Sequence, residues 1–197
     1  MVSLCQASFT QLGHRHIPIL FLALAAAATV YYYNHSYLLE SIDDAPNQRN
    51  IWVAAHANRI KKIQWLLLSF LFVGGSYQLY TLLPAIHLLE LHDIVCCALI
   101  ALGSFLYYFD TKKYPRLNLR SYGIVKPFVI GCIWAGLGVF APYLFLKLSG
   151  MQYASMAHVT ILYLSNALFI SMLAVLFDIK DYETDANKQM KTLVVQI

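Results

Sequence analysis

The chain contains one stretch that decides its fold class, VTILYLSNALFISMLAVLF, at residues 159–177. It carries no charged side chain. A helix of this length crosses the roughly 30 Å hydrocarbon core of a bilayer. Within such a core every backbone N–H and C=O group needs a partner in the same segment, and a helix supplies one. The stretch therefore predicts a transmembrane helix.

Apolar stretches of comparable length recur along the rest of the chain. Its 197 residues are 59% hydrophobic and only 12% charged, with a mean hydropathy of +0.58, which is outside the range of ordinary soluble domains. We therefore predict an all-α fold, a polytopic transmembrane helix bundle of about five spans that forms a single domain over residues 1–197. The expected spans are residues 17–33, 63–83, 94–109, 127–146 and 159–177.

The basic residues are unevenly distributed among the connections between these spans. Of the fourteen Lys and Arg residues, all but two lie between the first and second spans, between the third and fourth, or after the fifth. Only Arg15 and Lys147 lie on the other side. Because Lys and Arg accumulate in cytoplasmic connections, we expect an integral membrane protein with its N-terminus outside and its C-terminus cytoplasmic.

An acidic patch, DIKDYETD at residues 178–185, directly follows the last apolar stretch. If the helix continues, Asp178, Asp181 and Asp185 fall within an arc of about 60° on its surface, whereas Glu183 points elsewhere. Carboxylates spaced one turn apart can hold a hard divalent cation, and Mg²⁺ bound in this way completes its shell with water and substrate phosphates. The alternative is that these charges form the solvated boundary of the span.

The residues after the patch extend it into a longer motif. The segment DIKDYETDANKQMKTLVV, residues 178–195, resembles the second aspartate-rich motif of the UbiA superfamily of intramembrane prenyltransferases. In that motif a span ends in an Asp-x-x-x-Asp pair, often after a further polar position, and a Lys-Thr pair and an apolar run follow. The matching residues here are Asp181 and Asp185 for the pair, Asp178 for the preceding position, and Lys191 with Thr192 for the closing pair.

The order of the spans is also similar to that family. Its aspartate-rich loops follow the second and sixth of nine helices on the cytoplasmic side, so the five spans predicted here correspond to helices two to six. The first motif of the family, roughly Asn-Asp-x-x-Asp-x-x-x-Asp, is degenerate here and is matched at Asn34 alone. Glu40, Asp43 and Asp44 lie nearby but out of register. The resemblance thus implies an incomplete domain that lacks one helix before and three after, and therefore lacks a complete active chamber.

The resemblance implies Mg²⁺-dependent transfer of a prenyl group from a prenyl diphosphate to an acceptor. Asp181 and Asp185 would bind the metal with support from Asp178, and Lys188 and Lys191 would contact the diphosphate. Whether the chain is an active enzyme stays open. One alternative is a non-catalytic membrane protein on the same scaffold that binds isoprenoid or lipid or serves as a partner subunit, and another is a small transporter component. Because an incomplete bundle exposes packing faces, we expect a homo- or hetero-oligomer in contact with membrane lipid.

A basic segment, RNIWVAAHANRIKK at residues 49–62, precedes the second span. We expect it to lie in the membrane interface as a short helix. His56 and Arg59 would then be one turn apart on one face, a spacing that can bind phosphate, so Arg59 is a further candidate ligand of the diphosphate. The alternative is that the segment anchors the chain to lipid headgroups.

The remaining patterns mainly exclude functions. His87, Glu90 and His92 resemble a loose metal cluster, but their spacing differs from that of HExxH. No Walker loop or Rossmann fingerprint occurs, and no basic stripe with interleaved aromatic residues indicates nucleic-acid binding. No predicted span has an ionisable residue in its middle, which argues against an ion pathway. Pro142 is expected to kink the fourth span, and close helix contacts are expected at Gly74, Gly75, Gly131, Gly136 and Gly138.

Overall fold

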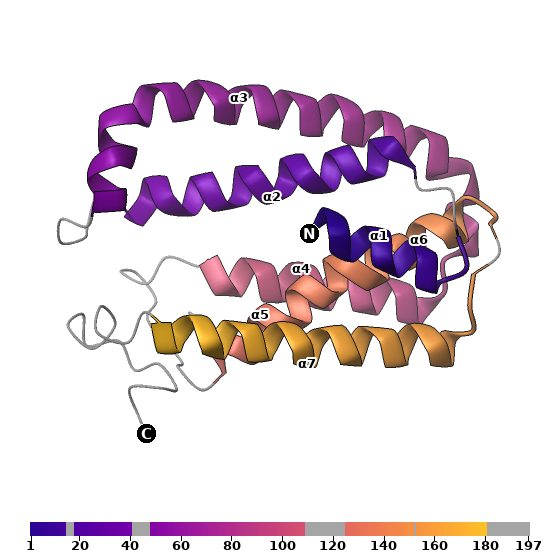
Figure 1. Cartoon of the computed structure of the whole chain (residues 1–197). Helices are drawn as coiled ribbons and strands as arrows, with labels where there is room; N and C mark the ends of the chain where they lie inside the picture. The colour runs from indigo at the N-terminus through magenta and orange to yellow at the C-terminus, as the bar shows by residue number, and fades with distance from the viewer. Residues whose placement is uncertain (15–17, 41–47, 109–124, 152, 181–197) are drawn as a thin grey trace. The chain divides into compact units, whose positions relative to one another are not determined.

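The computed structural model describes residues 1–14, 18–40, 48–108, 125–151 and 153–180, and the regular elements in these residues are all helices (Figure 1). The chain forms two compact units. Unit 1 comprises residues 1–6 and 16–84, and unit 2 comprises residues 7–15 and 85–197. The elements are α1 (Val2–Gln11), α2 (Ile19–Glu40), α3 (Gln48–Leu82), η1 (Leu83–Leu88), α4 (Leu91–Tyr108), α5 (Lys126–Ala135), η4 (Gly136–Phe140), α6 (Ala141–Leu148) and α7 (Met156–Lys180).

Unit 1 consists mainly of the antiparallel pair α2 and α3, which lie side by side in Figure 1. Gln64 on α3 is buried and its side-chain amide donates a 2.9 Å hydrogen bond to the carbonyl of Tyr31 on α2. Further along, a Cβ on Gly74 would lie 3.0 Å from Leu24 Cδ2, whereas one on Gly75 would meet nothing within 4 Å. Polar side chains and glycines of this kind hold apolar helices together, and here Gly74, but not Gly75, makes the predicted close contact.

Unit 2 has its core where α5 packs along α7. A Cβ on Gly131 would overlap Ser171 Oγ and the carbonyl oxygen of Ala167, so only glycine permits this approach of the two helices. One turn before Ala167 on α7, the Tyr163 hydroxyl donates a 3.2 Å hydrogen bond to the carbonyl of Cys132 on α5. Gly136 faces Ile100 of α4 in the same way, at 2.6 Å from Ile100 Cδ1 for a built Cβ. The predicted close contacts at Gly131 and Gly136 are therefore confirmed.

The helix over residues 126–148 is interrupted by the π-turn η4, which ends just before Pro142. Proline has no N–H to donate, and in an α-helix its ring would clash with the carbonyl four residues earlier, at Gly138. The chain widens instead, and the Ala141 N–H bonds to the carbonyl of Gly136, five residues back. One extra residue in a turn rotates all later side chains by about 100°. The kink expected at Pro142 stays a prediction, and what the structure has before this residue is a π-turn, which sets the direction in which Tyr143 and Lys147 face.

The N-terminal helix α1 has no counterpart among the predicted spans, the first of which begins at residue 17. Phe9 is fully buried and meets the Phe145 ring edge to face, with the centroids 5.9 Å apart. The Ala154 N–H donates a 3.3 Å hydrogen bond to the carbonyl of Leu12. The second half of α1 therefore belongs to the packing of unit 2.

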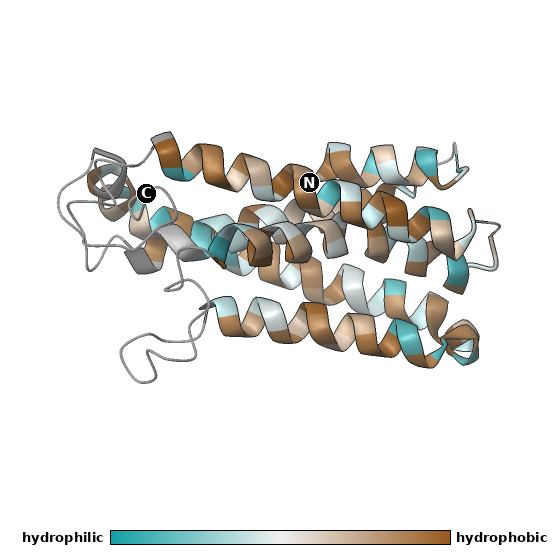
Figure 2. Cartoon of the chain, turned by 90° about the horizontal axis from the view of Figure 1, so that it is seen from below, coloured by the Kyte–Doolittle hydropathy of each residue, from teal (hydrophilic) through white to brown (hydrophobic). Residues whose placement is uncertain are grey.

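Within the described residues, three helical segments are long and apolar enough to cross a membrane, namely Ala57–Leu88, Lys126–Leu148 and Met156–Ile179. Two other apolar helices, Ile19–His35 and Leu91–Tyr107, are shorter. Hydrophobic residues predominate along the helices, with polar residues interspersed among them (Figure 2). On α3, for example, Trp65, Phe72 and Leu79 are each at least 65% exposed. The all-α prediction is confirmed and these surfaces fit a membrane protein, but five complete spans stay a prediction.

Substitution of Gly131 tests the contact between α5 and α7. We expect Gly131→Ala to lower the free energy of unfolding by about 1–3 kcal/mol, because the new methyl group overpacks a site closed by backbone. Gly75→Ala is the matched control, and should be neutral or stabilising by up to about 1 kcal/mol, since its methyl meets open space and alanine favours helix. Unfolding in mild detergent, followed by circular dichroism, measures both. Equal effects of the two variants would contradict the packing described.

Candidate functional site

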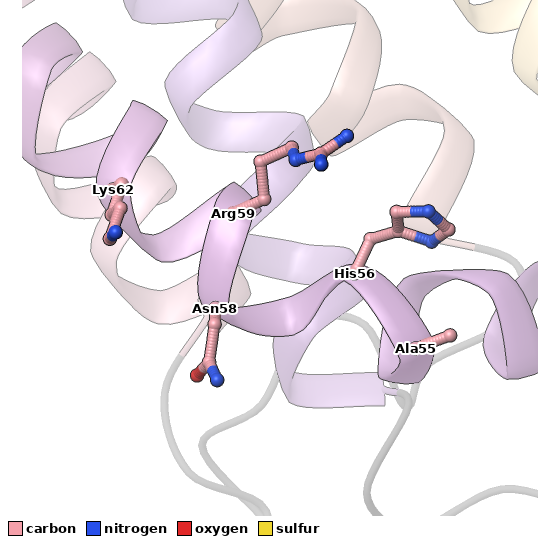
Figure 3. A pocket seen from close by; sticks show the side chains of 5 residues that line it. All are labelled: Ala55, His56, Asn58, Arg59 and Lys62. Atoms are coloured by element: carbon pink, nitrogen blue, oxygen red, sulfur yellow. The ribbon is translucent and has the colours of Figure 1, made fainter.

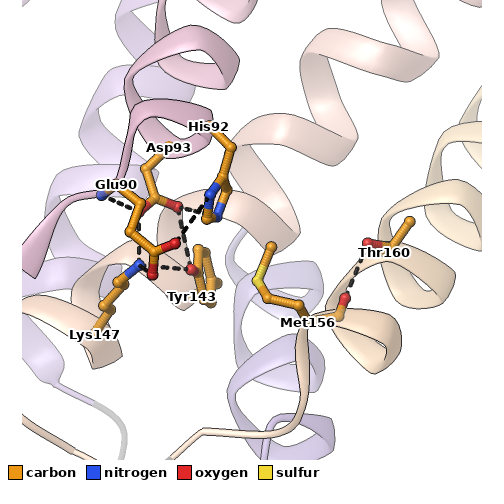
Figure 4. Close-up of polar contacts among 7 residues, drawn as sticks. All are labelled: Glu90, His92, Asp93, Tyr143, Lys147, Met156 and Thr160. Carbon is orange, nitrogen blue, oxygen red and sulfur yellow. Dashed lines mark hydrogen bonds and ion pairs between the residues drawn. The ribbon is translucent and has the colours of Figure 1, made fainter.

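A cluster of charged and polar side chains is buried in unit 2, where the start of α4 meets the end of α6 (Figure 4). Lys147 Nζ lies 2.7 Å from Asp93 Oδ2 and 3.0 Å from Glu90 Oε1. The Tyr143 hydroxyl donates a 3.1 Å hydrogen bond to Asp93 Oδ1 and lies 3.3 Å from Lys147 Nζ. Asp93 and Tyr143 are 0% exposed and Lys147 is 7% exposed. The cluster thus removes two opposite charges almost entirely from solvent.

Asp93 is positioned by the first turn of α4. It is the third residue of that helix, and its Oδ2 also accepts a 3.0 Å hydrogen bond from the backbone N–H of Glu90, the residue before the helix. This is half of a capping box, in which a side chain at the third position satisfies an N–H that the helix leaves unpaired. The same carboxylate therefore caps α4 and neutralises Lys147.

Lys147 is positioned by the way α6 ends. The N–H of Gly150 bonds to the carbonyl of Lys147 at 3.2 Å, and the N–H of Met151 bonds to that of Leu146 at 3.0 Å, which is the Schellman arrangement. Gly150 has a φ of +64°, a left-handed conformation that glycine adopts without steric cost. The helix stops one turn after Tyr143, so Tyr143 and Lys147 reach the same carboxylate from successive turns.

The residues His87, Glu90 and His92, noted above as a loose cluster whose spacing does not match a metal motif, do not form one group among the described residues. His87 lies in η1, while His92 Nδ1 lies 3.5 Å from Glu90 Oε2 and His92 Nε2 lies 3.0 Å from Asp93 Oδ1. The ammonium group of Lys147 is the cation between the carboxylates. Among the described residues no group of three or more His, Cys, Asp or Glu side chains could hold a metal ion.

The sequence contained a signal for this cluster that our reading missed. Lys147 interrupts the apolar run YLFLKL, and Asp93 begins the apolar run DIVCCALIAL. Two lone opposite charges at the ends of predicted spans, both on the side with few basic residues, indicate a pair. The sequence does not show that these two residues, which are 54 positions apart, touch each other.

A second ion pair lies where α5 begins and α7 ends. Lys126 Nζ lies 2.6 Å from Asp178 Oδ1, and the two side chains are 17% and 8% exposed. The other carboxylate oxygen, Asp178 Oδ2, is buried and has no hydrogen-bond partner among the described residues. Asp178, predicted to support a metal, is therefore on the last turn of α7 with one oxygen held by a lysine and one oxygen left over.

The other predicted site residues have different outcomes. Asn34 lies on α2 in unit 1 and is half-buried. The remaining residues of the second aspartate motif lie outside the described residues, so their predicted roles stay predictions, and these are Asp181, Asp185, Lys188 and Lys191.

Arg59 lies on α3 and borders a hollow of about 520 Å³ in unit 1 (Figure 3). The basic segment was predicted to form a separate short helix. In the structure it is instead continuous with α3. Arg59 and His56 extend from the same side of the helix in Figure 3, whereas Asn58 points the other way. Ala55 and Lys62 also line the hollow. His56 and Arg59 thus lie one turn apart on the same side of α3, as the spacing predicted (Figure 3).

Comparisons with known proteins add no relative to this description. No family model matches the chain, and neither a curated protein nor a solved structure matches it. The functional argument therefore depends on the residues themselves.

Removal of Lys147 tests the buried cluster. We expect Lys147→Met to lower the free energy of unfolding by about 3–5 kcal/mol, because Asp93 is left as a buried charge without its partner. In the double variant Asp93→Asn/Lys147→Met, most of that loss should be recovered, since neither charge remains. Glu90→Gln is the control and should cost less than about 1 kcal/mol, because the Glu90 side chain is 66% exposed. Additive effects in the double variant would show that the pair does not couple the two helices.

Proposed function

We propose that this chain is a membrane protein that binds a prenyl diphosphate together with Mg²⁺ at the cytoplasmic end of α7 and transfers the prenyl group to an acceptor. The observation that carries the proposal is Asp178 Oδ2, a buried carboxylate oxygen without a hydrogen-bond partner in the described part of the chain. Helix α7 ends at Lys180, so Asp178 lies on its last turn, and the rest of the aspartate motif follows directly in the sequence. An unsatisfied buried carboxylate oxygen is costly unless a cation or donor completes it.

The donor set fits Mg²⁺. Carboxylate oxygens are the ligands that this ion takes from proteins, and one or two carboxylates suffice when phosphate oxygens and water complete the shell. Asp181 and Asp185 would hold the ion, with Asp178 Oδ2 as the supporting ligand. When bound, the metal would neutralise the diphosphate and stabilise it as a leaving group.

Lys126 has a positioning role in this proposal. Its 2.6 Å contact with Asp178 Oδ1 holds one oxygen of the carboxylate and thereby sets where the other oxygen points. Its ammonium group also places a positive charge at the end of unit 2 where the diphosphate would bind. Lys188 and Lys191 of the motif would add further cations there.

The prenyl chain would lie against the apolar surface of α7. Phe169 on this helix is 57% exposed, and Met172 and Leu176, further along the same helix, are 66% and 58% exposed. Tyr163, by contrast, is bonded to the Cys132 carbonyl and so belongs to the packing of α7 against α5. A lipid-facing helix of this kind offers the hydrocarbon environment that an isoprenoid tail requires.

A second candidate function is isoprenoid or lipid binding without catalysis on the same scaffold. Two observations favour it. Asn34 alone matches the first aspartate motif, which would halve the set of metal ligands. Lys126 already neutralises one charge of the second motif, at Asp178.

Metal-dependent binding of a prenyl diphosphate tests the proposal. Isothermal titration of the purified full chain with geranylgeranyl diphosphate should show binding that requires Mg²⁺. Asp181→Asn and Asp185→Asn should each weaken it by about tenfold or more, because a ligand of the ion is lost. Glu183→Gln is the matched control, since the helical spacing puts Glu183 off the shared face. Metal-dependent binding that survives both aspartate substitutions would refute the assignment. Binding without release of inorganic diphosphate would favour the non-catalytic candidate.

The charge balance at Asp178 can be tested separately. In Lys126→Gln the buried carboxylate loses its cation, so we expect the unfolding temperature to fall, and millimolar Mg²⁺ should restore more of it than it adds to the wild-type protein. The double variant Lys126→Gln/Asp178→Asn should show no such extra response to Mg²⁺. A response to Mg²⁺ that is equal in all three proteins would argue against a cation at Asp178.

A further inference from the structure

We propose that the hollow on α3 in unit 1 binds the phosphate group of an anionic membrane lipid. Its basic side chains are His56, Arg59 and Lys62, and Ala55 and Asn58 complete the lining (Figure 3). This site is separate from the aspartate motif of unit 2, and its chemistry follows from α3 alone.

The location of the hollow along α3 places it at the level of lipid headgroups. The helix has 35 residues and is therefore about 50 Å long, whereas the hydrocarbon core is about 30 Å thick. The segment able to cross the membrane begins at Ala57, and the residues from Arg59 to Lys62 are its first basic turn. Trp52, one turn before His56, is 58% exposed, and tryptophan favours the same interfacial zone.

The helical spacing puts the three basic side chains on one side of α3, where they border the hollow. His56, Arg59 and Lys62 are three residues apart in turn, so they spread over an arc of about 120°. Ala55 lies four residues before Arg59 on this side and has only a methyl group, which leaves room between the longer side chains. A phosphate can therefore approach the helix among three donors instead of one.

The His56 ring is held in a defined orientation. Its Nδ1 lies 2.9 Å from the carbonyl of Trp52, and the ring stacks on the Trp52 indole with the centroids 4.5 Å apart. A carbonyl can only accept a hydrogen bond, so Nδ1 carries the proton. Nε2 is then the ring nitrogen that remains for a ligand, and when protonated it donates to a phosphate oxygen.

The charge of α3 favours an anion. The helix has no Asp or Glu in its sequence, and Arg59 and Lys62 make no ion pair among the described residues. A guanidinium group binds phosphate oxygens in a bidentate manner, and lysine adds a point charge beside it. Basic side chains next to a membrane span attract anionic headgroups. Here we expect the headgroup to bind at the hollow that these side chains line.

Lipid binding by the full chain tests the proposal. The protein is purified in mild detergent, mixed with dioleoyl phosphatidylglycerol or dioleoyl phosphatidylcholine, and analysed by native mass spectrometry. We expect retention of phosphatidylglycerol over phosphatidylcholine. Arg59→Gln and Lys62→Gln should each weaken retention of phosphatidylglycerol about tenfold, because a charged hydrogen bond is lost. Arg59→Lys should lie between wild type and Arg59→Gln, since the charge remains without the bidentate geometry.

Lys61→Gln is the matched control. Lys61 is exposed on the same helix and carries the same charge, but it does not line the hollow. An effect of Lys61→Gln equal to that of Lys62→Gln would show diffuse attraction and overturn the site. Equal retention of the two lipids would also overturn it.

A soluble competitor distinguishes the source of the phosphate. Inorganic diphosphate at millimolar concentration should leave phosphatidylglycerol bound if the site takes a lipid. Displacement that depends on Arg59 would instead assign the hollow to a free diphosphate and overturn the lipid assignment. Unchanged circular dichroism of each variant, all of which alter exposed side chains, ensures that loss of binding is not loss of fold.

Discussion

The salt bridge between Lys147 and Asp93 constrains unit 2 more than any other contact. A charge removed from water costs several kcal/mol, so a nearly buried lysine is tolerated only with its partner in good geometry. The constraint determines how α4 and α6 are arranged, because the start of one helix must meet the end of the other. It also requires the π-turn at Gly136–Phe140, since an uninterrupted helix would direct Lys147 and Tyr143 about 100° away.

The ion pair between Lys126 and Asp178 constrains the arrangement of helices at the other end of the unit. It joins the start of α5 to the end of α7, so α4, the α5–α6 segment and α7 run in alternating directions. Between the two ion pairs, α5 and α7 approach closely through small residues, with Gly131 against Ser171. In lipid the hydrophobic effect does not drive helices together. Ion pairs at both ends and close contacts of small residues between them can stabilise the association of such helices.

The two ion pairs differ in what they leave unsatisfied, and this difference separates structure from function. In the Asp93 cluster both oxygens of the Asp93 carboxylate accept hydrogen bonds, from Tyr143, Lys147 and the Glu90 N–H, so this carboxylate is fully paired. At Asp178 one buried oxygen has no hydrogen-bond partner within the described residues. A fully paired carboxylate stabilises the fold, whereas a carboxylate with one oxygen left over can accept a cation. For this reason we place the proposed chemistry at the end of α7 and treat Asp93 as structural.

The amino-acid sequence by itself determined which segments are apolar helices, because hydropathy over some twenty residues is a local property that does not depend on the partners of a helix. It also predicted the close contacts at Gly131 and Gly136, since glycine is the residue type that permits them. Only the tertiary structure decided that Lys147 meets Asp93, that Lys126 meets Asp178, and that α1 packs on Phe145. Each of these contacts joins residues more than fifty positions apart, and their pairing depends on helix packing and on the register after a π-turn, which no local pattern encodes.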